Sequence, residues 1–246
     1  MIEPFFLERE VFAVWREVPN AQRAWVLAPP FAEEEKSARR VLTEVASLFE
    51  RRGESSLLFS FRGQGDSGGD FAQMSLDDWR DDLASAIEET HRRAPSATIG
   101  VLGVRLGASL SLQVAARRDD VARLVLIEPL LSGRSFLSQQ LMRQKIRAGL
   151  TGSASSDEKE EASFDDLDGW PLGAKMKSGL QSLDLNNELP HFEGKTRVFQ
   201  IGPRVEVAPP LRALSDELSA RIEALVMPPF WNLLDYSSPK GLLERL

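Results

Sequence analysis

The five residues from Gly103 to Gly107 have the types and spacing that most suggest chemistry in this chain. They read Gly-Val-Arg-Leu-Gly, follow the apolar run 97–102 and lead into a helical pattern. In a nucleophile elbow, two glycines at this spacing let a strand and a helix approach closely, and the exposed residue between them is usually serine. Here that residue is Arg105, whose guanidinium stays protonated and has no lone pair to attack a carbonyl carbon. The sequence therefore predicts the sharp turn without its usual nucleophile.

A serine-based mechanism of this kind also needs an acid and a histidine, which normally follow the elbow in the chain. The chain has 2 histidines, and neither is well placed: His91 ends a predicted helix and His191 precedes the penultimate predicted strand. In the loop where the acid is expected, Val205 takes its place and Glu206 follows as an imperfect substitute. Residues 227–232, where the histidine is expected, contain none. All three positions of such a triad are therefore changed.

Three other serines offer a hydroxyl near the elbow. Ser109 lies four residues into the helix that follows the elbow and is expected to pack inside. Ser67 and Ser132 are loop residues at the same end of the predicted sheet, but without a base, and turn or cap propensity explains both. A displaced catalytic set, in which Ser67 or Ser132 acts with Glu128 or Glu206, remains an alternative.

The glycine-rich segment Arg62–Asp70 matches two known motifs and fits neither. Its glycine spacing resembles a dinucleotide-binding fingerprint, but Asp66 would lie inside the phosphate cradle and the next helix begins only near Ser75. It also contains the string Gly-Asp-Ser-Gly-Gly of chymotrypsin-like proteases, in which a histidine precedes the serine, whereas none precedes Ser67. We therefore expect a glycine-rich turn that packs beside the elbow.

Two roles are open for Arg105. At a helix N-terminus beneath a cap, its fork of N–H donors suits recognition of an anion, which the helix dipole also favours. Alternatively, Arg105 forms an internal ion pair with Glu128, which leaves the neighbouring strand at the same end of the sheet. We slightly favour the ion pair. Both roles hold together if a ligand carboxylate or phosphate competes for the guanidinium.

The remaining predicted ligand-binding residues lie beside the elbow arginine. Val104 and Leu106 flank it in the chain. In the loop after an earlier strand, Pro30 has no N–H, so Phe31 and Ala32 would have to supply donors for an oxyanion. The candidate site comprises Arg105, Glu128, Phe31, Ala32, Val104 and Leu106.

Alternating short apolar runs and helical patterns position these residues. Strands are expected at Phe5–Leu7, Val11–Trp15, Ala24–Leu27, Ser56–Phe61, Ala97–Leu102, Arg123–Ile127, Thr196–Ile201 and Ile222–Val226. Helices are expected at Glu33–Arg51, Ser75–His91, after the elbow, and at Pro210–Leu218 and Pro239–Leu246. Such alternation predicts an α/β protein, with a mostly parallel sheet covered by helices on both faces and a binding crevice at the carboxyl ends of its strands.

Residues 132–190 interrupt this alternation, and we expect them to form a helical cap inserted over the strand ends. Phe136–Leu150 predicts a helix with several basic residues, and Trp170–Leu183 predicts a second short helix. The polar segment Thr151–Asp168 is expected to be a mobile loop.

Composition narrows the class of protein. A chain of 246 residues suits a single domain, residues 1–246. With 37 acidic and 30 basic residues, a net charge of -7 gives no support for binding nucleic acid or an anionic membrane. The absence of cysteine excludes disulfides and thiolate metal sites, and we expect no metal and no cofactor. The acidic start and the lack of a long apolar run predict a soluble cytoplasmic protein without a membrane span.

Several segments together resemble the exosortase A system-associated hydrolase 2 family of the α/β-hydrolase superfamily. They are Pro29–Glu34, Gly63–Phe71, the helix with Trp79, Gly103–Ala108, Glu128–Gly133 and Pro228–Trp231. The similarity is best over residues 29–150. It implies a bacterial protein encoded near machinery for exopolysaccharide production and for sorting proteins with PEP-CTERM tails. It also implies that arginine at the elbow is typical of the family.

These observations lead to three hypotheses. The first is a non-catalytic protein of hydrolase fold that binds a small anionic ligand or a protein partner in the crevice. The alternative is a serine-type esterase or acyl hydrolase with the displaced catalytic set. The third is a scaffold subunit of a polysaccharide or sorting complex that uses the basic helix Phe136–Leu150 as its contact surface.

Overall fold

The core of the structure is one sheet of eight strands. The computed structural model describes residues 1–151, 165–167, 169–233 and 235–246. In spatial order the strands are β1 (Ile2–Phe6), β2 (Phe12–Arg16), β4 (Ser55–Phe59), β3 (Arg23–Ala28), β5 (Thr98–Val104), β6 (Val121–Ile127), β9 (Lys195–Gly202) and β10 (Arg221–Val226). Within this sheet β2 runs against its neighbours, and the strands from β4 to β10 are parallel. The carboxyl ends of the parallel strands therefore share one edge.

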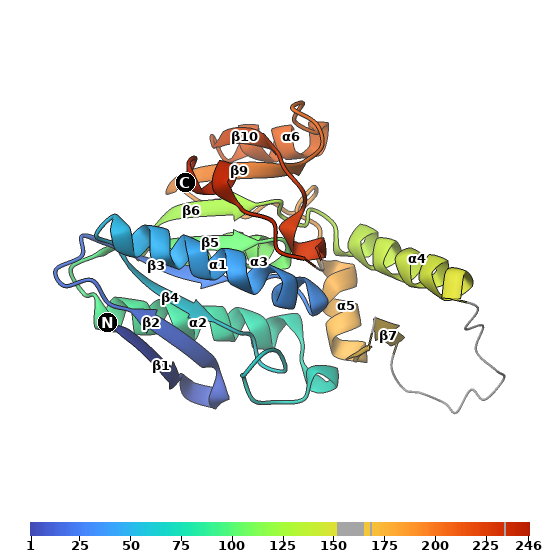
Figure 1. The fold of residues 1–246 in the computed structure, drawn as a ribbon, viewed down its shortest axis with the longest axis horizontal. Coiled ribbons are helices and arrows are strands. Elements are labelled where there is room, and N and C mark those ends of the chain that lie inside the picture. The colour runs from blue at the N-terminus through green and yellow to red at the C-terminus, as the bar shows by residue number, and fades with distance from the viewer. Residues whose placement is uncertain (152–164, 168, 234) are drawn as a thin grey trace.

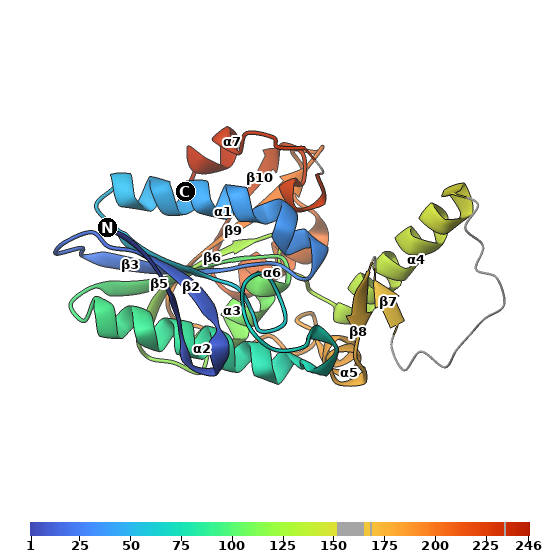
Figure 2. The same cartoon turned by 60° about the horizontal axis from the view of Figure 1, so that its bottom comes forward.

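Helices cover both faces of this sheet, as the sequence predicted (Figures 1 and 2). One face packs against α1 (Glu33–Arg51) and α7 (Lys240–Leu243), and the other against α2 (Leu76–Arg93), α3 (Leu106–Ala115) and α6 (Pro209–Glu217). Central strands are consequently buried on both faces. In β5, every residue after Thr98 is buried, which explains why that strand is a continuous apolar run instead of an alternating one.

The two long helices begin and end where local sequence signals indicate. α1 spans the expected residues and turns Val41, Leu42 and Val45 inward. At the start of α2, Ser75 forms a reciprocal capping box with Asp78, each side chain bonding the other residue's backbone N–H. Acidic residues occupy the first turn of both helices, where the helix dipole stabilises negative charge.

The cap elements lie beyond the carboxyl ends of the strands. α4 (Gly133–Thr151) projects from the body, and α5 (Ala174–Ser182) packs near its base (Figure 1). A Cβ on Gly133 would collide with the carbonyl oxygen of Leu180 in α5, so the start of α4 requires glycine. The start of α4 is therefore packed tightly against α5.

Within the cap, the sequence prediction was wrong at one place. β7 (Asp165–Leu167) and β8 (Trp170–Leu172) form an antiparallel hairpin, where a loop and the start of a helix were expected. Gly169 supplies a positive φ of 90° at the turn, and its N–H donates to the carboxylate of Asp166. Each of these two strands has three residues, which is too short for a recognisable alternation of apolar and polar residues in the sequence. The rest of the expected mobile loop, residues 152–164 and 168, lies outside the described residues.

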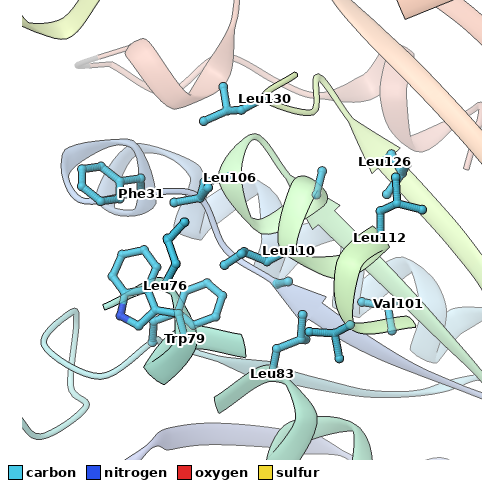
Figure 3. Close-up of a cluster of buried hydrophobic side chains, with 14 of the residues drawn as sticks. Phe31, Leu76, Trp79, Leu83, Val101, Leu106, Leu110, Leu112, Leu126 and Leu130 are labelled. Atoms are coloured by element: carbon cyan, nitrogen blue, oxygen red, sulfur yellow. The ribbon is translucent and has the colours of Figure 1, made fainter. Parts of the chain in front are cut away.

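A cluster of buried aromatic and aliphatic side chains packs near the edge of the sheet that the carboxyl ends of the parallel strands form (Figure 3). The Trp79 ring stacks on Phe61 with centroids 4.7 Å apart, and the Phe31 ring lies 5.5 Å from Trp79. Phe31 and Leu106 are both buried there, so the loop after β3 and the first turn of α3 rest on one packed base. Among the described residues, no helix is both long and apolar enough to cross a bilayer.

Candidate functional site at the elbow

The turn between β5 and α3 has the predicted elbow geometry. Arg105 has φ 55° and ψ −118°, a strained conformation for a residue other than glycine. A Cβ on Gly107 would collide with the carbonyl oxygen of Pro29, and one on Gly103 with the backbone of Ala108. The two glycines therefore allow the strand, the helix and the neighbouring loop to meet, and the sequence prediction of this turn is confirmed.

The guanidinium of Arg105 pairs with Glu34, which corrects the predicted ion pair with Glu128. Its Nε lies 3.4 Å from both carboxylate oxygens of Glu34, and its Nη2 lies 3.3 Å from one of them. Glu34 reaches the elbow because the first turn of α1 opens at the same edge of the sheet. The carboxylate of Glu128 instead accepts a hydrogen bond of 2.7 Å from the backbone N–H of Ile201. Both side chains of the Arg105–Glu34 pair are largely buried, with exposed fractions of 14% and 6%.

Two aromatic rings lie beside the same guanidinium. Its central carbon is 5.2 Å from the centroid of the Trp231 ring and 5.9 Å from that of Phe136. Phe136 comes from the first turns of α4, and Trp231 from the short helix η3 (Phe230–Asn232) after β10. Trp231 thus lies in the segment where a triad histidine was expected, and it provides an aromatic wall that attracts a cation.

Ala32 does not offer the free oxyanion donor that the sequence suggested. Its N–H donates to Oε1 of Gln64 at 2.6 Å, and Gln64 in turn donates to the buried carboxylate of Glu35 at 2.7 Å. Like Arg105, Ala32 has a positive φ, 51°, and these bonds hold it there. Within the described residues, neither the N–H of Phe31 nor that of Leu106 donates a hydrogen bond, and Leu106 is the first residue of α3. Phe31 lines the cavity described below, whereas Leu106 is fully buried.

The glycine-rich loop has the structural role that we favoured. Its Gln64 joins the network just described, which also includes Ser60, whose hydroxyl donates to Glu35 at 2.6 Å. Ser67 donates to the carbonyl oxygen of Ser60 and accepts from the N–H of Phe12. Sequence reasoning missed Gln64 and Glu35, because nothing in their local pattern distinguishes a buried polar contact from ordinary loop and helix residues.

A cavity of about 380 Å³ lies above the Arg105–Glu34 pair, between the loop after β3, α4 and η3. Its lining residues are Phe31, Ala32, Glu33, Glu34, Lys36, Ser37, Gln140, Arg143, Leu167, Trp231 and Asn232. Apolar rings and polar groups therefore alternate around it, and its size is typical of a small-molecule site. Of the predicted site residues, Phe31 and Ala32 line this cavity. Arg105, Glu128, Val104 and Leu106 are not among its lining residues, and Arg105 adjoins it through its contacts with Glu34 and Trp231.

Comparison with known proteins places the chain in a family. The model of the family described as serine aminopeptidase S33 matches residues 34–160, about half of the chain. The chain belongs to this S33 family. A comparison with curated proteins found no match.

Solved structures share the fold of this chain. An esterase of Pyrococcus furiosus, Pf2001, has a TM-score of 0.68 and 14% identity, over 100% of this chain and 88% of that one. Est1E of Butyrivibrio proteoclasticus, solved with ferulic acid bound, has a TM-score of 0.63 and 16% identity, over 90% and 88% of the two chains. A hydrolase of Agrobacterium vitis has a TM-score of 0.60 and 13% identity, over 100% and 95%. These similarities show the α/β-hydrolase fold.

In this S33 family member, both histidines lie away from the elbow. His91 lies in the last turn of α2, which leads into the amino end of β5, and His191 precedes the amino end of β9. Because β5 and β9 both end at the elbow's edge, the two histidines lie at the opposite edge of the sheet. Val205 and Glu206, after β9, are both exposed to solvent.

The serines nearest the elbow of this S33 protein have structural hydrogen bonds. Ser109 is buried in α3, and its hydroxyl donates to the carbonyl oxygen of Leu130 at 2.8 Å, as the predicted inward packing requires. Ser132 accepts from the N–H of Ser135 at the start of α4. The serines of residues 152–164 lie outside the described part of the chain.

Burial governs the electrostatics of the site. It raises the pKa of Glu34 above its usual value of 4.5, while the charges of Arg105 and Arg143 act in the opposite direction. It likewise raises the pKa of Glu128, against the N–H of Ile201 and the charge of Arg105. Among the described residues, no group of histidine, aspartate and glutamate side chains is arranged to hold a metal ion. The site therefore consists of one guanidinium, two carboxyl groups and two backbone donors beneath an aromatic wall.

Proposed function

We propose that this protein binds a small anionic molecule at the elbow without carrying out acyl transfer there. The observation that supports this is the residue at the elbow itself. Arg105 adopts the strained conformation of a nucleophile, but its side chain offers donors instead of an attacking atom. Neither histidine of the chain lies at that edge, so a serine–histidine pair cannot form there.

Donors remain for such a ligand. Within the described residues, the hydrogen bonds of Arg105 to Glu34 involve Nε and Nη2, and Nη1 makes none. The N–H groups of Phe31 and Leu106 complete a set of donors at the N-terminus of α3, where the helix dipole also favours negative charge. In this proposal Ala32 and Val104 hold those backbone donors in place, and Glu128 lies close enough to Arg105 to oppose the ligand's charge.

Glu34 acts as an internal competitor for the ligand. Its carboxylate occupies the guanidinium fork through contacts of 3.3–3.4 Å, which are long for a charge-assisted pair. A ligand carboxylate, sulfate or phosphate would share or replace this interaction. The proposal therefore predicts modest affinity for simple inorganic anions, with additional affinity from groups that contact Phe31 and Trp231.

The test is the melting temperature of the purified protein, and its heat of binding, in sulfate and phosphate at constant ionic strength. We expect Arg105→Ala to weaken anion binding by about tenfold or more, the loss typical of a charged hydrogen-bond donor. Arg117→Ala, at an exposed position just after the end of α3, is the matched control and should behave as wild type. Equal anion affinity in Arg105→Ala and Arg117→Ala would refute the proposal.

A serine-type acyl hydrolase with a displaced catalytic set is the second candidate, and the comparisons favour it. Its support is membership of a family named for a serine peptidase and similarity to esterases. A fluorophosphonate probe and a panel of p-nitrophenyl esters would test it, with peptide mapping across all serines, including Ser67 and Ser132. Labelling of one serine, together with turnover that is lost when it becomes alanine, would establish this candidate over the first.

The cellular setting is proposed from resemblance alone. It suggests a bacterial protein that is associated with exopolysaccharide production or PEP-CTERM sorting and contacts a protein partner there. Co-purification with and without the basic helix substitutions Arg143→Ala and Arg147→Ala would test a scaffold role.

A further inference from the structure

The cap contains a second cavity, separate from the one above Arg105. It has a volume of about 430 Å³ and is lined by residues of α4, the β7–β8 hairpin and α5. Figure 2 shows these elements side by side at the base of α4. Its lining residues are Arg134, Leu137, Ser138, Leu141, Asp165, Leu172, Lys177 and Gln181. Among the described residues, the two cavities share no lining residue, because they use different faces of α4.

The floor of this cap cavity is apolar. Leu137 and Leu172 are buried, and Leu141 is half-buried one helical turn after Leu137 on the same face of α4. Three leucines from two elements thus form a continuous surface suited to an alkyl chain. The volume lies in the range of sites for small molecules.

The rim of the cap cavity is mainly cationic. Lys177 of α5 pairs with Asp165 at 2.5 Å, but both side chains are about two-fifths exposed, at 43% and 40%. Such an exposed pair stabilises the fold little, so Lys177 can exchange Asp165 for another anion at small cost. The Nε of Arg134 donates to the carbonyl oxygen of Gln181 at 2.9 Å, which uses one of its five N–H donors. Two cations therefore face one carboxylate above an apolar floor.

We propose that the cap cavity binds an amphipathic anion. Its alkyl chain would lie on Leu137, Leu141 and Leu172, and its carboxylate or sulfate head would lie between Arg134 and Lys177. This proposal is independent of the function proposed for Arg105, since neither the guanidinium nor the donors at the elbow take part.

Calorimetric titration of the full chain with sodium decanoate, below its micelle-forming concentration, tests this site. Sodium acetate controls for the head alone, and decyltrimethylammonium bromide for the chain with the opposite charge. We expect both to bind at least about tenfold more weakly than decanoate, because each lacks either the apolar contact or the charge attraction. Equal affinity for the cationic and anionic amphiphiles would overturn the proposal.

Variants locate the site. Lys177→Met keeps the length of the side chain without its charge and should weaken decanoate binding by roughly fivefold or more, whereas Asp165→Asn should strengthen it. Lys175→Met, two residues earlier on the same helix and exposed, is the matched control and should leave affinity unchanged. Arg105→Ala should also leave it unchanged. Loss of decanoate binding in Arg105→Ala, or identical affinity in Lys177→Met and Lys175→Met, would contradict a site in the cap.

Discussion

The loop after β4 and the elbow after β5 each hold a buried arginine beside a carboxylate, but the two pairs are built differently. Arg62 donates from Nε to Asp82 at 2.6 Å and from its backbone N–H to the same carboxylate at 2.9 Å. Its Nη2 also donates to the carbonyl oxygen of Asp78 at 2.9 Å. At the elbow, Arg105 contacts Glu34 only at 3.3–3.4 Å within the described residues.

Burial is similar in the two pairs, so it does not explain the difference. The exposed fractions are 13% and 1% for Arg62 and Asp82, and 14% and 6% for Arg105 and Glu34. The two pairs differ in how well the N–H donors of each guanidinium are hydrogen-bonded and in what lies beside each guanidinium. The Arg62 guanidinium donates to the carboxylates of Asp82 and Asp78 and to the carbonyl oxygen of Asp78, all in α2, whereas the partner of Arg105, Glu34, lines a cavity. The first pair fastens a loop to α2, and we infer that the second keeps donors in reserve for a ligand.

Breaking the tighter pair should give the largest effect. Arg62→Ala leaves the nearly inaccessible Asp82 without its charged partner, and we expect a loss of about 3–5 kcal/mol in the free energy of unfolding. Arg105→Ala should cost less, because Glu34 can protonate beside the cavity. Urea denaturation of both variants measures this order. The reverse order would mean that the elbow pair is the structural one.

The looser pair should instead control ligand affinity. Glu34→Gln removes the competing charge, so sulfate affinity should rise by up to about tenfold, opposite in sign to the effect of Arg105→Ala. Glu44→Gln, farther along α1 and outside the cavity lining, is the control. A fall in sulfate affinity in Glu34→Gln would show that the carboxyl group helps to hold the anion.

The pH dependence of sulfate binding should follow the protonation of Glu34. Since burial raises its pKa above 4.5, the carboxyl is neutral at low pH and does not compete, so affinity should fall as pH rises through the raised pKa. The same group binds more protons in the folded than in the unfolded state, so its contribution to stability also falls over that window. Glu34→Gln should flatten both profiles. A wild-type binding profile that Glu34→Gln leaves unchanged would assign the titration to another group, such as Glu128.

The smallest effect is expected at Glu128. Glu128→Gln keeps an oxygen that can accept from the N–H of Ile201 and removes one negative charge near Arg105. Sulfate affinity should rise by less than about threefold, since the two side chains are not in direct contact. A larger rise than in Glu34→Gln would restore Glu128 as the principal partner of Arg105.

Much of the fold was predictable because its signals are local. The apolar runs, the helix that ends at Arg51 and the serine cap of α2 each depend on residues close in the chain. The β7–β8 hairpin was not predictable, since its strands of three residues carry no clear periodicity. At the site, the elbow was recognised from two glycines, but its partner Glu34 is 71 residues away, and no local pattern links the two residues.

The sequence by itself determined the strained elbow, the arginine that it presents and the mostly parallel sheet, because glycine spacing and hydrophobic pattern limit the backbone directly. Only the tertiary structure decided which carboxylate meets that arginine. Glu34 in the first turn of α1 and Glu128 directly after β6 lie at the same edge of the sheet, and the choice between them depends on where α1 begins and on the N–H of Ile201 that holds Glu128. The same is true of Gln64, which occupies the N–H of Ala32, and of the leucine-lined cavity in the cap. Packing between residues far apart in the chain determines where these groups lie, and no local sequence pattern indicates their positions.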